Sequence, residues 1–157
     1  MWHHLRPPLF LITGCGWLLA SAGLGLALWL GIILGRPLSP MLRLVHVHGA
    51  LVGGVAQIIL GAMLTFIPTL LMTGKDRPES HPVLYLAINA GAVALITGFW
   101  LQNRTIIAIA GSVILLVFLN VFREAGRQAR HSLNSPPLNL LFYGLALLSF
   151  FGGIGMG

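Results

Sequence analysis

The sequence predicts an all-α integral membrane protein: about five transmembrane helices in a bundle, with the N-terminus in the cytoplasm. Of its 157 residues, 57% are hydrophobic and only 8% are charged, and the mean hydropathy is +0.91. Soluble domains carry roughly 25% charged residues. The charged residues are also clustered, and the uncharged stretches between them approach the ~20 residues that a helix needs to cross a bilayer core. We therefore expect a single transmembrane domain over residues 1–157.

Proline, glycine and charged residues divide the chain into five apolar segments. The first is too long for the apolar core of a signal peptide and no clear cleavage site follows it, so we interpret it as a retained span. The last is still apolar at Gly157, which favours the chain being the N-terminal part of a longer protein. The expected helices cover residues 9–34, 44–71, 82–101, 105–122 and 138–157.

Lysines and arginines are distributed unequally between the two ends of these helices, and basic residues collect in loops that stay in the cytoplasm. The N-terminus is therefore expected to be cytoplasmic, and the second helix to begin at the outer face. The net charge of +6 then needs no nucleic-acid partner, since no basic patch is interleaved with aromatic residues. Six basic residues fall on the N-terminal side, against Arg36, Arg43 and Arg104 on the other: Arg6, Lys75, Arg77, Arg123, Arg127 and Arg130.

The composition of the spans excludes several kinds of chemistry. The only cysteine, Cys15, lies in an apolar helix, so no intrachain disulfide is expected. Histidines, acids and Cys15 lie at different depths, which argues against a nucleophilic triad. Asp76, Glu79 and Glu124 fall in expected cytoplasmic loops, leaving no acid for a proton relay. A transport path is the weakest hypothesis, because the few polar residues in the spans suit hydrogen bonds between helices: Gln57, Thr65, Asn89, Thr97 and Asn120.

Two of the six histidines, His46 and His48, are expected inside a span, near its start. An ionisable residue within the membrane is a functional-site hypothesis by default, although a histidine so near the interface can also simply reach water. Two positions on a helix are about 200° apart, so the rings point to nearly opposite sides and cannot share one metal. Either they serve different partners, or His46 lies before the regular helix begins.

The faces below the two histidines differ. His48 shares an apolar face, suited to a porphyrin, with Val52, Val55 and Ile59, whereas His46 lies above Gly49, Gly53 and Gln57, a face with little bulk. A haem iron takes axial histidine and sometimes methionine. The one other in-chain candidate at that level is Met156; otherwise the iron is five-coordinate, or its second ligand comes from elsewhere. Arg36 and Arg43 are expected to pair with the haem propionates.

The second helix resembles the NnrS family of haem- and copper-containing membrane proteins, which are linked to nitric oxide metabolism. The resemblance covers roughly residues 4–73, including the start from Leu5 to Leu11, and more distantly extends to the large subunit of haem-copper oxidases. It implies ligand roles for His46 and His48, and a bacterial inner membrane location. Gly49 stands where that family tends to have an acidic residue. The residues that carry the resemblance are the H-x-H pattern of His46 and His48, followed by Gly53, Gly61, Leu64, Thr65 and Pro68.

Two functions are compatible with these observations. The first is a haem b-binding membrane subunit in electron transfer or nitrogen-oxide chemistry, with copper as the weaker cofactor hypothesis. Its partners would be the lipid bilayer and other membrane subunits, or a second half that supplies the missing axial ligand. The alternative is a cofactor-free structural subunit that packs against a larger respiratory or oxygenase complex. No residue is assigned a catalytic role, and whether the chain is an enzyme is left open.

Overall fold

The computed structural model is helical in the parts of the chain that it describes. These are residues 8–71 and 82–130, followed by residues 141, 142, 144–146, 148, 149 and 152. Four helices in these parts are long and apolar enough to cross a membrane: Pro8–Ile33, Pro40–Leu70, Pro82–Trp100 and Arg104–Arg130. This confirms a multi-pass helical architecture, with four such helices where the sequence predicts about five. The fifth expected helix, residues 138–157, falls largely outside the described residues.

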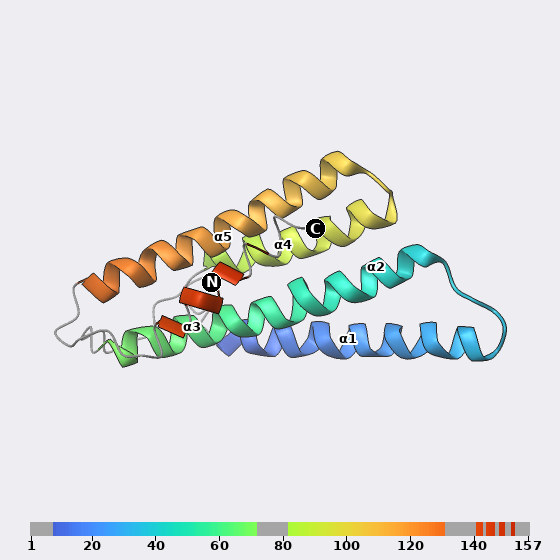
Figure 1. The fold of residues 1–157 in the computed structure, drawn as a ribbon, viewed down its shortest axis with the longest axis horizontal. Helices are drawn as coiled ribbons and strands as arrows, with labels where there is room; N and C mark the ends of the chain where they lie inside the picture. Colours follow the sequence, from blue (N-terminus) through green and yellow to red (C-terminus); the bar gives the residue numbers. More distant parts are fainter. Residues whose placement is uncertain are drawn as a thin grey trace.

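The first two spans form an antiparallel hairpin (Figure 1). Helix α1 (Pro8–Ile33) ends in a turn at Gly35, whose φ of +64° lies in the left-handed region that glycine adopts without steric cost. The Arg36 N–H closes the turn by donating to the Gly31 carbonyl at 2.9 Å. Helix α2 (Pro40–His48) then begins with proline in its first turn and Ser39 as its N-cap. The second span therefore starts at Pro40, four residues before the expected Leu44.

The second span is continuous but changes its winding. After α2 come the π-helical segment η1 (Gly49–Ala56) and α3 (Gln57–Leu70). Glycines allow α1 to approach η1 closely: a Cβ at Gly53 would lie 2.5 Å from Trp17 Cδ2, and one at Gly54 would lie 2.6 Å from Leu18 Cδ2. π-Helical turns are rare and are found frequently at functional sites. The π-helical segment of the second span is thus also the segment that packs closely against α1.

The third and fourth spans form a second antiparallel hairpin, α4 (Pro82–Trp100) and α5 (Arg104–Arg130). Asn103 caps α5 through its Oδ1, which accepts from the backbone N–H groups of Thr105 at 3.0 Å and Ile106 at 3.2 Å. Helix α5 runs eight residues beyond the expected end at Phe122. A sequence rich in helix-forming Arg, Glu, Gln and Ala supports this extension.

The apolar core lies where the two hairpins pack on each other, mainly between α3, α4 and α5 (Figure 1). Helix α1 joins it through Phe10, whose ring meets Tyr85 of α4 edge-on at a centroid distance of 5.3 Å. Because neighbouring helices alternate in direction, the turn between α1 and α2 and the start of α5 lie at one end of the bundle, and the C-terminus of α5 lies at the other (Figure 1). The core residues are Phe10, Ala56, Leu60, Met63, Ile67, Leu71, Ile88, Leu95, Ala110, Ile114, Val117, Phe118 and Val121.

Candidate haem-ligand site on the second span

His46 lies inside the regular helix and faces α1. It is the seventh residue of α2, so the alternative that it precedes the helix is wrong. Its Nδ1 is 2.7 Å from the Ser21 carbonyl oxygen. The ring lies over Gly25, where a Cβ would come within 2.6 Å of His46 Cε1. Because a helical carbonyl points towards the residue four positions on, a side chain at position 25 would obstruct this bond.

His48 faces α4 on the other side of the span. Its ring packs against the Phe99 ring at a centroid distance of 4.2 Å with the planes tilted by 36°. Its Nδ1 is 2.9 Å from the carbonyl oxygen of Leu44, one turn earlier in the same helix. The two histidines therefore serve different partners, as their spacing predicts, and both are half-buried.

The hydrogen bonds fix which ring nitrogen remains available in each neutral imidazole. A backbone carbonyl oxygen can only accept, so Nδ1 must carry the proton in both rings. The lone pair is then on Nε2. Histidines that bind metals characteristically donate their other ring N–H to a carbonyl or a carboxylate, which fixes the tautomer and the ring orientation. The chemistry of this donor fits a histidine ligand of a haem iron, with one imidazole on each side of the helix.

The surroundings of the histidines differ from the expected faces. The predicted apolar wall below His48 is not continuous, because Val55 and Ile59 are exposed at 41% and 43% while His48 packs against α4. The face of little bulk below His46 is filled by α1, since Gly49 packs against Ser21 and Gly53 packs against Trp17. The first difference follows from the π-helical segment, whose wider turns change which residues share a side with His48, and the second follows from the close packing of α1 on η1.

Arg36 and Arg43, the expected partners of propionates, are exposed near the start of the second span. Arg36 lies in the turn before α2 and Arg43 in its first turns. Arg43 precedes His46 by three positions and His48 by five, so by the helical period it lies on the side of His46. The long arginine arms lie at the same end of the span as both histidines.

The expected second axial ligand lies outside the described part of the chain. Met156, the one expected in-chain candidate, lies outside those residues, as do His3, His4, His81 and His131. Within residues 8–71, 82–130 and the described positions beyond 140, no group of three or more His, Cys, Asp or Glu side chains could hold a metal ion. The described residues thus offer His46 and His48 as two separate histidine donors on opposite sides of the span.

A buried amide pair on the same span is a feature that the sequence does not identify as a unit. Gln57, fully buried, donates from Nε2 to Asn89 Oδ1 at 2.9 Å, and Asn89 Nδ2 lies 3.4 Å from Gln57 Oε1. Thr65 and Thr97 instead bond carbonyls of their own helices. The sequence shows single polar residues within apolar segments, but only the packing of α3 on α4 shows that Gln57 and Asn89 contact each other.

The described helices define a multi-pass helical membrane protein with two histidines on opposite sides of one span. No protein-family model, curated protein or solved structure matches this chain.

Proposed function

We propose that this chain is a haem-binding membrane subunit in which His48 is an axial ligand of a b-type haem iron. The observation that carries the proposal is the 2.9 Å contact of His48 Nδ1 with the Leu44 carbonyl, which leaves the Nε2 lone pair for a metal. Covalent attachment of haem uses a pair of cysteines, and Cys15 is the only cysteine of the chain. A haem held here would supply a one-electron redox centre.

The neighbouring residues have separate roles in this proposal. Phe99 supports one face of the His48 ring and limits its rotation. His46 faces α1 and cannot reach the same iron, so it serves a second group or holds α1 in place. Arg36, in the turn before α2, and Arg43, whose long side chain starts on the side of His46, would provide charge-assisted hydrogen bonds for propionates near the membrane surface.

The proposal has consequences for assembly and orientation. The chain would be an NnrS-like subunit in electron transfer or nitrogen-oxide chemistry, in a bacterial inner membrane, and the second axial ligand would come from another subunit or from further sequence. The excess of basic residues near the N-terminal side supports a cytoplasmic N-terminus, with the histidines near the outer face. An apolar segment over residues 138–157 would add a fifth span.

The test is the haem content of the detergent-purified chain, from reduced-minus-oxidised spectra and pyridine haemochrome quantification. We expect near-stoichiometric haem in the wild type and near-background haem in His48→Ala. Val47→Ala is the matched control, since Val47 is the exposed neighbour on the same turn. Full haem content in His48→Ala would overturn the ligand assignment.

A cofactor-free structural subunit is the second candidate, and two contacts favour it. The His46 bond to Ser21 and the Gln57–Asn89 pair are complete interhelical contacts that need no ligand. In this case the protein would be colourless when purified alone and recovered mainly together with partner subunits. Recovery of stable, coloured monomer would argue against it.

A further inference from the structure

The C-terminal two turns of α5 carry a basic face. Arg123, Arg127 and Arg130 follow each other at intervals of four and three residues, which places them on one side of a helix. All three residues are exposed. Gly126 lies between them, and nothing would lie within 4 Å of a Cβ added there. The basic face is therefore open to an occupant, with no bulky side chain between the arginines.

The length of α5 places this face at the membrane surface. Its 27 residues span ~40 Å at ~1.5 Å per residue, ~10 Å more than a hydrocarbon core of ~30 Å. The stretch from Arg104 to Arg123 spans ~28 Å and so matches the core alone. The residues from Arg123 to Arg130 then lie at the level of the lipid headgroups.

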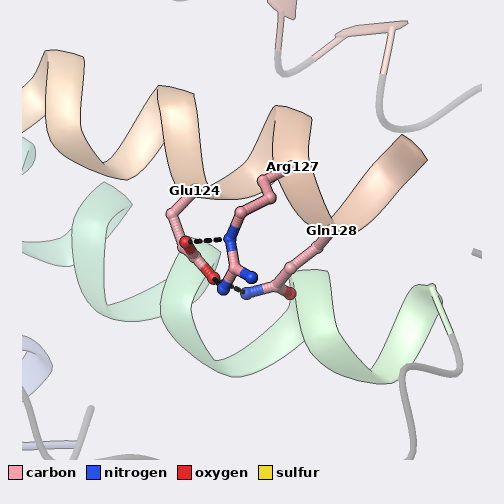
Figure 2. A network of polar contacts seen from close by, with 3 residues as sticks. All are labelled: Glu124, Arg127 and Gln128. Carbon is pink, nitrogen blue, oxygen red and sulfur yellow. Dashed lines mark hydrogen bonds and ion pairs between the residues drawn. The ribbon is translucent and has the colours of Figure 1, made fainter. Parts of the chain in front are cut away.

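Glu124 accepts hydrogen bonds from two side chains in this part of the helix. Glu124 Oε2 accepts from Arg127 Nε at 2.9 Å, and its Oε1 accepts from Arg127 Nη2 at 2.6 Å (Figure 2). Gln128 Nε2 also donates to Glu124 Oε1 at 2.9 Å. Arg127 is thereby held in one orientation while its side chain stays 61% exposed. A pre-oriented guanidinium loses less conformational entropy when it binds a further anion.

From this geometry we propose that the Arg123–Arg127–Arg130 face binds the phosphate of an anionic phospholipid headgroup. With Glu124 included, the stretch carries a local charge of +2 at headgroup level. Arginine donors match phosphate oxygens in geometry as well as in charge. Anionic lipids attract basic segments next to a membrane span. The proposal does not depend on haem binding, and either result can stand without the other.

The test measures lipid selectivity of the full chain reconstituted in mixed phosphatidylglycerol and phosphatidylcholine vesicles. Spin-labelled versions of the two lipids give their relative association constants from the motionally restricted fraction. The test variant is Arg123→Gln, Arg127→Gln and Arg130→Gln together. The control, Arg104→Gln, removes one arginine charge from the other end of the bundle and is compared with the single variants Arg123→Gln and Arg130→Gln.

We expect the wild type and the control variant to prefer phosphatidylglycerol several-fold, and the test variant to lose most of that preference. An unchanged preference in the test variant, or an equal loss in the control, would overturn the proposal. So would competition by inorganic phosphate beyond that of sodium chloride at equal ionic strength, since that would indicate a site for free phosphate. Arginines near a helix C-terminus also favour the helix itself, so circular dichroism must show unchanged helix content; if it does not, the single variants replace the triple one in the same comparison.

Discussion

His48 and Gln57 both contact α4 although they are nine residues apart on the second span. The His48 ring packs on Phe99, and the Gln57 amide bonds Asn89. On a regular α-helix, nine residues make about two and a half turns and would place the two side chains on opposite sides. The π-helical segment from Gly49 to Ala56 has wider turns of a little over four residues, and so returns Gln57 to the side of His48.

The first prediction concerns the contact of His46 with α1. Gly25→Ala places a methyl group 2.6 Å from His46 Cε1, so the ring must move and its bond to Ser21 lengthens or breaks. We expect a loss of about 1–3 kcal/mol in the free energy of unfolding in detergent. Gly23→Ala is the control, because nothing lies within 4 Å of its added Cβ. Equal stability of the two variants would contradict the described contact.

A second prediction concerns the packing of η1 on α1. Gly53→Ala places a methyl group 2.5 Å from Trp17 and should destabilise the hairpin by about 1–3 kcal/mol. Trp17→Ala should partly restore stability in the double variant, because it removes both the Cγ and the ring atoms that the methyl group meets. Gly111→Ala, at an open position of α5, serves as the control. The measurement is thermal unfolding in micelles, and additive effects of the two substitutions would argue against direct contact.

The amide pair predicts an asymmetry between two substitutions. Asn89→Leu leaves both ends of the fully buried Gln57 amide without their partner. Gln57→Leu leaves only Asn89 Oδ1 without its donor, because Asn89 Nδ2 still donates to the Tyr85 carbonyl at 2.8 Å. Asn89→Leu should therefore cost more, about 1–3 kcal/mol for unsatisfied buried groups. The double variant should recover much of the loss, and a double-mutant cycle of unfolding free energies measures it.

The turns at Gly35 and Gln102 share one hydrogen-bond pattern, so removing the glycine from the first and introducing a glycine into the second should change the free energy of unfolding in opposite directions. Gly35 and Gln102 both have positive φ, +64° and +53°, and each is followed by an N–H that bonds the carbonyl five residues back. Gly35→Ala should lower the free energy of unfolding by about 1 kcal/mol, and Gln102→Gly should raise it by a similar amount. Unfolding of each variant in detergent, compared with the wild type, tests both signs. A shift of the same sign in the two variants would contradict this account of the turns.

Local sequence determined the spans and the mutual direction of the histidines. Hydropathy and length require apolar segments to form helices, because backbone groups in lipid must be satisfied within the segment. The spacing of His46 and His48 on a helix likewise requires their rings to diverge. The likeness of the second helix to haem-containing families carried the ligand hypothesis, and the haem measurement will decide it.

Tertiary structure decided what each side chain meets. The expected apolar face of Val52, Val55 and Ile59 assumed regular α-helical turns. Because η1 is π-helical, these residues do not share one side of the span as expected. The π-helical turns accompany the close packing of Gly53 and Gly54 on Trp17 and Leu18, contacts between residues more than thirty positions apart. The bond of His46 to Ser21, 25 positions away, and the pairing of Gln57 with Asn89, 32 positions away, also join distant parts of the sequence. A local pattern gives the side of a helix on which a residue lies, whereas its partner depends on how the helices pack.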